Sequence, residues 1–146
     1  MLRTCALIAS IAFLLAPGCA TPAHSEPRST VHLPAEGALG PYSGSVRSGG
    51  LCFVSGTIGK PGDSFASEAR AAIDAVEKEL ARSELTLGDV LTATVFLTDM
   101  TNYGELNAIY AERFPQPYPA RTCIAVKELP AGAHVEIQVI ARRGKE

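Results

Sequence analysis

Val90-Leu-Thr-Ala-Thr-Val-Phe-Leu97 is the stretch from which the fold can be worked out. Its residues Leu91, Ala93, Val95 and Leu97 alternate with Thr92, Thr94 and Phe96. A period of two residues is typical of a β-strand that buries one face. We therefore expect residues 90–97 to form a central strand, with other elements packed against its buried face.

An amphipathic helix is predicted on each side of this strand in the sequence. Before it, apolar residues recur at helical spacing, and Asp63 or Ser64 can cap the N-terminus of the helix. These apolar residues are Phe65, Ala69, Ala72, Ile73, Val76 and Leu80. After it, Thr98-Asp99 can cap a second helix, which ends at the prolines of residues 115–119. The second helix carries Met100, Tyr103, Leu106, Asn107, Tyr110 and Phe114.

The other apolar stretches predict further strands. A turn at residues 48–50 joins two of them into a β-hairpin, and residues 37–44 form a loop rich in turn residues. The expected strands are Val31–Leu33, Ser45–Arg47, Leu51–Ile58, Ala120–Val126 and Ala133–Ala141. The order hairpin, helix, strand, helix, two strands predicts an α+β domain. Both helices would cover one face of a roughly six-stranded mixed sheet.

Length and composition indicate a single globular domain. The chain has 146 residues, of which 47% are hydrophobic and 19% are charged. The formal net charge is -2, from 13 Lys and Arg against 15 Asp and Glu. Because a nucleic-acid-binding surface is normally strongly basic, nucleic acid is not the expected partner.

Residues 1–27 have the pattern of a secretory signal peptide and tether, so the domain is expected over residues 28–146. Arg3 precedes an uncharged apolar run at residues 6–16, which is short for a membrane span. Two interpretations stay open. Cys19 follows a run typical of bacterial lipoprotein signals and is a candidate for lipidation and membrane attachment. Alternatively, cleavage after Ala20 or Ala23 would release a soluble protein into the periplasm, and both interpretations predict export.

Two cysteines remain in the predicted domain. Cys52 and Cys123 both lie in apolar stretches expected to be strands, which favours buried free thiols, although a disulfide between them stays open in an oxidising compartment. The sequence contains no Cys-x-x-Cys pair and no cluster of histidines, so no metal site is predicted.

The alternation of side chains along the last two predicted strands indicates which face of the sheet carries Arg121 and Glu136. If Ile124 faces the helices, both charged residues lie on the opposite face of the sheet. That face also carries Cys123 and Ile140, so we expect it to pack against another subunit. Arg121 and Glu136 could then form a structural ion pair at an interface. Alternatively, the arginine could hold a carboxylate while the glutamate orients or activates a water molecule.

Several short motifs, in the same order and at similar spacing, resemble the Rid family (reactive intermediate deaminase, also called YjgF). They are Gly40-Pro-Tyr-Ser43, Val54-Ser-Gly-Thr-Ile58, Thr94-Val-Phe-Leu-Thr-Asp-Met100, Asn107 with Tyr110, Pro119-Ala-Arg-Thr-Cys123 and Val135-Glu-Ile137. The resemblance implies a chorismate-mutase-like α+β fold and a homotrimer with its active sites between subunits. It also implies hydrolysis of 2-imino acids, such as 2-iminopropanoate, to 2-keto acids and ammonia without a cofactor.

The resemblance also implies roles for individual residues. Arg121 would bind the substrate carboxylate, and Glu136 would position the water that attacks the imine carbon. Tyr42, Gly56, Asn107 and Cys123 would line the pocket. This chain departs from the family pattern in two places near that pocket. Gly44 stands where the family has a glutamine, and the segment between Ile58 and the first helix is shorter than is typical.

Three functions were weighed. The first is a trimeric enamine/imine deaminase. The second is a non-catalytic module that binds a small carboxylate or holds unfolded proteins, but such a module has no need of Glu136. The third, a ribonuclease or translation inhibitor, is disfavoured by the net charge, by the signal-like segment and by the absence of a basic stripe interleaved with aromatic residues.

Overall fold

A computed structural model of the chain describes residues 29–62 and 64–143. The predicted signal peptide, the tether and Cys19 lie outside these residues. The strands are β1 (Val31–Pro34), β2 (Ser43–Ser48), β3 (Leu51–Ile58), β4 (Val90–Leu97), β5 (Ala120–Ala125) and β6 (Val135–Arg142). The α-helices are α1 (Phe65–Ala81) and α2 (Tyr103–Arg113), and short 3-10 turns η1 (Leu87–Asp89), η2 (Met100–Asn102) and η3 (Pro130–Gly132) connect elements.

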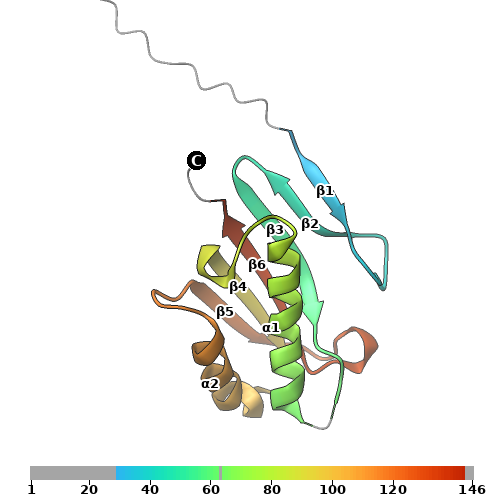
Figure 1. Cartoon of the computed structure of the whole chain (residues 1–146). Coiled ribbons are helices and arrows are strands. Elements are labelled where there is room, and N and C mark those ends of the chain that lie inside the picture. Colours follow the sequence, from blue (N-terminus) through green and yellow to red (C-terminus); the bar gives the residue numbers. More distant parts are fainter. Residues whose placement is uncertain (1–28, 63, 144–146) are drawn as a thin grey trace, which may run out of the picture.

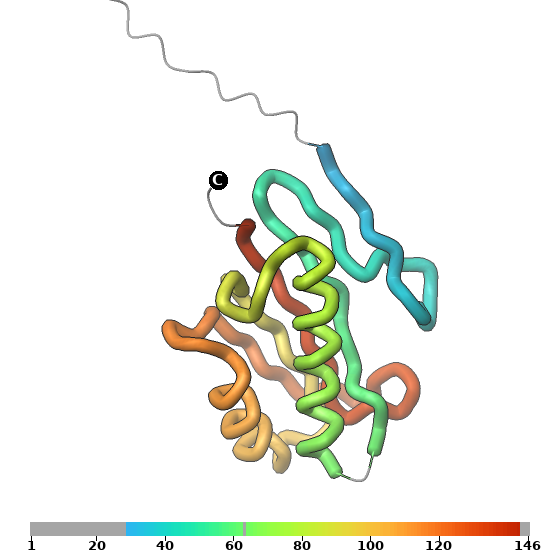
Figure 2. Tube along the Cα trace, viewed as in Figure 1, coloured from blue at the N-terminus to red at the C-terminus, as the bar shows by residue number. Residues whose placement is uncertain are grey.

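The strands form one sheet in the order β1-β2-β3-β6-β4-β5. β4 and β5 are parallel, and every other neighbouring pair is antiparallel. Figures 1 and 2 show both helices on the same face of this sheet, with α1 running along β3 and β6. The predicted α+β fold, with two helices on one face of a six-stranded mixed sheet, is therefore confirmed.

The core lies between the helices and this face of the sheet. In α1 the residues predicted from helical spacing are buried, apart from the partly buried Phe65, and Ser64 caps the helix by accepting a hydrogen bond from the Ser67 backbone N–H. In β6, Val135, Ile137 and Val139 alternate into the same core. Among the described residues, no helix is long and apolar enough to cross a membrane.

Three sequence-based expectations differ from the structure in detail. Leu91 is 46% exposed, whereas Val90 is buried, because a bulge between Val90 and Thr92 shifts the register of β4 against β6. Residues 43 and 44 belong to β2 rather than to a loop. Asp99 caps the 3-10 turn η2, by accepting from the Thr101 backbone N–H at 2.8 Å, and α2 begins only after that turn.

The buried carboxylate of Glu68 links the first turn of α1 to the start of β6 by hydrogen bonds. Glu68 is 2% exposed, and its Oε1 accepts hydrogen bonds from the backbone N–H groups of His134, at 2.5 Å, and Val135, at 3.4 Å. Its Oε2 lies 2.8 Å from Nδ1 of His134. A side chain at Gly59 would overlap the Glu68 carbonyl, so the corner between β3 and α1 requires glycine. Nothing in the sequence pattern singled out Glu68.

Replacing Glu68 should destabilise the protein substantially. In Glu68→Ala, the backbone N–H groups at the start of β6 lose a buried acceptor, and we expect a loss of about 2 to 4 kcal/mol in the free energy of unfolding, measured in urea. Glu68→Gln keeps an acceptor oxygen and should lose less. The control is Glu77→Ala, which removes a half-exposed partner of Arg113 and should cost less than about 1 kcal/mol. Equal losses in Glu68→Ala and Glu77→Ala would contradict the anchoring role.

Candidate active site in two halves

Arg121 lies on the helix-facing side of the sheet, not on the opposite side as expected. Its register partner in β4 is Ala93, which is buried beneath the helices, and residues in register on neighbouring strands point to the same face. Ile124, expected to face the helices, is 43% exposed and is in register with Phe96. Both lie on the face of the sheet that carries no helix, which we call the open face. The expectation was wrong because β5 is an outer strand. It has apolar residues on both faces, so their alternation does not identify the buried face.

Glu136 lies on the open face, as expected. It alternates with the buried residues Val135 and Ile137, and its register partners are Phe96 in β4 and Ile58 in β3. Arg121 and Glu136 therefore point to opposite faces of the sheet. Within one chain they cannot form the ion pair that was considered as an alternative.

On the helix side, α2 supplies the partners of Arg121. Nη2 of Arg121 donates to Oδ1 of Asn107 at 2.5 Å and to the Tyr103 hydroxyl at 3.4 Å. The guanidinium carbon lies 4.7 Å from the centroid of the Tyr110 ring and 5.7 Å from that of Tyr103. These distances allow cation–π attraction. No carboxylate among the described residues pairs with Arg121, so its positive charge is held in place without being neutralised.

We call Tyr103, Asn107, Tyr110, Arg121 and Cys123 the arginine half-site. Burial raises the pKa of Tyr110 to about 12, against a smaller opposing effect of the Arg121 charge, so the phenol is neutral at ordinary pH. The Tyr110 ring also stacks on Phe114, with centroids 3.9 Å apart. Burial likewise raises the pKa of the Cys123 thiol, although Arg121 opposes the shift. Cys123 is therefore a partly buried thiol whose environment disfavours the thiolate form.

The second half of the site is a hollow on the other side of the sheet. It has a volume of about 340 Å³ and is lined by Leu39, Gly40, Tyr42, Ser55, Gly56, Ile58, Pro130 and Glu136. We call Tyr42, Gly56 and Glu136, with this hollow, the glutamate half-site. Burial raises the pKa of Glu136 above the ordinary value of 4.5. A carboxyl group with a raised pKa is a stronger base than an ordinary glutamate and can still donate the proton that it accepts.

Gly56 shapes this half-site by having no side chain. The pairing of β3 with β6 shifts between Val54 and Thr57, which places Gly56 in a β-bulge. A Cβ atom there would overlap the Glu136 carboxylate. Beside it, the Tyr42 hydroxyl accepts a weak hydrogen bond from the Leu39 backbone N–H at 3.4 Å. The bulge and the loop at residues 39–42 therefore leave room for a small molecule at the carboxylate.

The structure thus divides the six predicted site residues into two groups. Asn107, Arg121 and Cys123 lie in the arginine half-site, and Tyr42, Gly56 and Glu136 lie in the glutamate half-site. Tyr103 and Tyr110 were not predicted as site residues, although they share one helix face with Asn107 at spacings of three, four and seven. Cys52 and Cys123 are free thiols, and no group of three metal-ligating side chains occurs within residues 29–62 and 64–143.

Known proteins resemble this chain in sequence over most of its length. The profile of the endoribonuclease L-PSP family matches residues 33–143. RutC family protein y4sK of Sinorhizobium fredii is 41% identical over 125 residues, which span 79% of this chain and 95% of that protein. The 2-iminobutanoate/2-iminopropanoate deaminase of Escherichia coli is 33% identical over 118 residues, spanning 75% of this chain and 92% of that protein.

Solved structures resemble the fold as well. NMB1025 of Neisseria meningitidis, a member of the YjgF protein family, matches with a TM-score of 0.74 at 25% identity. The match covers 82% of this chain and 98% of that chain. Sequence, sheet topology and the arrangement of the helices therefore agree, and the chain belongs to the Rid/RutC/YjgF family, whose profile carries the name endoribonuclease L-PSP.

Proposed function

We propose that this protein hydrolyses small 2-imino acids to 2-keto acids and ammonia. The observation that carries the proposal is Arg121. Its guanidinium is fixed by Asn107 and the ring of Tyr110, yet no carboxylate of the described residues neutralises it. A fixed guanidinium matches the planar geometry of a substrate carboxylate. The deaminase relative of Escherichia coli supports the reaction class.

A second copy of the chain would complete the site. The open face carries Phe53, in register with Ile140, and Ile124, in register with Phe96, and no layer of the described residues covers them (Figure 1). Phe53 and Ile124 are 40% and 43% exposed. An apolar sheet face of this kind is typically covered by another subunit. We propose that three copies pack through these faces, and that each arginine half-site meets the glutamate half-site of a neighbour.

The two half-sites suggest different roles in the reaction, substrate binding for one and proton transfer for the other. The substrate carboxylate binds Arg121, which places the imine carbon beside Glu136 of the neighbouring subunit. Glu136 accepts a proton from water as the water oxygen bonds to that carbon, and the C=N electrons move to nitrogen. Glu136 returns this proton to the nitrogen, then accepts the proton of the new hydroxyl group and passes it to the nitrogen as well, so that ammonia leaves as the carbonyl forms and Glu136 is again ionised. Water and imine are thereby converted into keto acid and ammonia.

The proposal also includes export. The pattern of residues 1–27 supports a secreted protein that is either released into the periplasm or held at a bacterial membrane through a lipidated Cys19. Such a protein would meet imines outside the cytoplasm.

Loss of the Arg121 guanidinium should abolish most of the activity. The substrate 2-iminopropanoate is generated in situ from alanine by an amino-acid oxidase with catalase, and pyruvate release is followed. In Arg121→Ala we expect kcat/KM to fall on the order of 100-fold or more, because the substrate carboxylate loses a charge-assisted contact. Arg143→Ala, which removes an exposed arginine paired with Glu84, is the matched control and should keep wild-type activity.

The oligomeric state separates the possible outcomes of this test. Full activity in Arg121→Ala would contradict the assigned role, and loss of the oligomer together with activity would identify a structural residue instead. A folded wild-type oligomer that binds pyruvate without accelerating hydrolysis would favour the non-catalytic binding module.

Activity should fall at acid pH because Glu136 must be ionised to accept a proton. Within the chain, burial raises the pKa of Glu136, and kcat/KM should decrease as the pH falls through that pKa. Glu136→Gln should remove this decrease of kcat/KM at low pH, which we call the acid limb of the pH profile. It should also lower kcat/KM by about 100- to 10,000-fold. Glu84→Gln, at a largely exposed position, should retain both the acid limb of the pH profile and the wild-type kcat/KM. An unchanged acid limb in Glu136→Gln would exclude Glu136 as the base.

A charge on the open face should dissociate the oligomer. Phe53→Asp would place a carboxylate in the proposed interface, where its desolvation is costly, and sedimentation velocity should show a shift from trimer to monomer. Val31→Asp is the control, because Val31 is similarly exposed at 36% but lies on the opposite face, in register with Arg47. A trimer in both variants, or a wild-type monomer, would contradict the proposed packing.

A further inference from the structure

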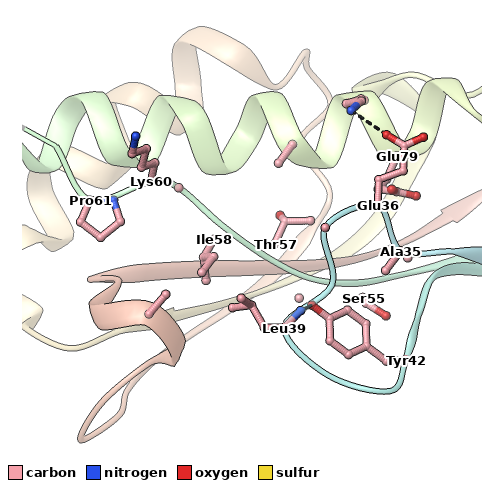
Figure 3. Close-up of a pocket in the computed structure, with 17 residues that line it drawn as sticks. Ala35, Glu36, Leu39, Tyr42, Ser55, Thr57, Ile58, Lys60, Pro61 and Glu79 are labelled. Carbon is pink, nitrogen blue, oxygen red and sulfur yellow. Dashed lines mark hydrogen bonds and ion pairs between the residues drawn. The ribbon is translucent and has the colours of Figure 1, made fainter.

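A second hollow opens directly beside the glutamate half-site. Its volume is about 440 Å³, within the usual range for small-molecule sites. Figure 3 shows that it lies between α1, the end of β3 and the loop that carries Glu36, Leu39 and Tyr42. We call it the side-chain hollow and define it by Leu39, Tyr42, Ile58, Pro61 and Ala75.

The path of the chain explains why this space is open. β2 pairs with β3 only as far as Ser45 and Val54, so residues 55–58 of β3 have no strand on that edge. In Figure 1, β3 continues beyond β2 toward the start of α1. Between β3 and α1, the described residues 59–62 and 64 form no helix or strand across the opening. The unpaired edge of β3 and the short connection therefore leave the hollow uncovered.

The two hollows adjoin each other and share lining residues. Both are lined by Leu39, Tyr42, Ser55, Gly56 and Ile58, and they differ in that one extends to Glu136 and the other to α1. A molecule whose reacting carbon lies beside Glu136 would therefore have the side-chain hollow within reach of its next few atoms. The methyl side chain of 2-iminopropanoate is too small to fill this volume, which would then hold only water.

Resting on the proposed function, we propose that the side-chain hollow binds the substrate's side chain and makes the enzyme prefer 2-imino acids with bulky apolar side chains. The exposed apolar surface at the junction supports this class of ligand, because Leu39 is 64% and Tyr42 is 48% exposed. Covering such surface contributes about 25 cal/mol per Å². Ile58, Pro61 and Ala75 extend the apolar lining toward α1.

Most of the charged residues around the hollow are already paired with one another or with a neighbour. Lys78 pairs with Glu36 at 3.0 Å, and Glu79 pairs with Arg82 at 2.8 Å. The Glu79 carboxylate also fills the space beside Gly44, where a Cβ would come within 2.9 Å of its oxygens. Lys60 also lines the hollow, is exposed and has no ion pair among the described residues, so a ligand with an acidic side chain is the alternative that the test must exclude.

The test compares imines of different size. Imines are generated in situ from alanine and from leucine, and the ratio of kcat/KM for the leucine-derived imine over the alanine-derived imine is measured. In the wild type we expect a ratio of one or more. Ala75→Leu fills part of the hollow and should lower this ratio about tenfold or more. Ala81→Leu, on the same helix but outside the hollow, should leave the ratio unchanged.

Binding of stable keto acids gives a readout that does not depend on catalysis. By calorimetry, 4-methyl-2-oxopentanoate should bind the wild type at least tenfold more tightly than pyruvate, and Ala75→Leu should remove this difference. Equal ratios in Ala75→Leu and Ala81→Leu, or a preference for the acidic imine derived from glutamate, would overturn the inference. If the wild type hydrolyses no imine, the proposed function fails, whereas the keto-acid affinities still decide whether the hollow selects bulky apolar side chains.

Discussion

Side chains alternate between the two faces of a β-sheet, and the candidate site depends on this constraint. Arg121 is in register with the buried Ala93, whereas Glu136 alternates with the buried Val135 and Ile137, so the two charged groups point to opposite faces. No rotamer change can bring them together within one chain. A catalytic site that uses both residues must therefore include two copies, and the uncovered apolar face provides a surface through which copies can associate.

Much of the fold could be predicted because its central elements have one clearly buried face. The helical spacing of Ala72, Ile73 and Val76 and the alternation in β6 both identified residues that the structure buries. The prediction failed where a strand is half-exposed or bulged. β5 lies at the sheet edge and carries apolar residues in both phases, and the bulge at Leu91 changes which residues of β4 face the core. Sequence periodicity contains neither the position of a strand in the sheet nor an extra residue in its register.

The six site residues came from the family resemblance, and their grouping into halves came from the structure. Gly56 could be placed in a strand from sequence, but its close approach to Glu136 depends on the pairing of β3 with β6. Tyr110 had a signal in its helical spacing with Asn107 and in the family motif that the two residues form, but it was not assigned to the site. Glu68 had no signal, because a glutamate in the first turn of a helix is ordinarily exposed and its partners are backbone groups far along the chain.

Within one chain, the sheet also prevents the two charged groups from pairing with each other. If Arg121 and Glu136 lay within reach of one another in the chain, they would form an ion pair, which would lower the pKa of the glutamate and occupy the guanidinium. The structure instead gives Arg121 uncharged partners, Asn107 and a Tyr110 whose raised pKa keeps the phenol neutral. Glu136 is half-buried without a cation beside it, and its pKa is raised. Within the chain, the arginine is thus left free to bind a carboxylate, and the glutamate is left without a charged partner among the described residues.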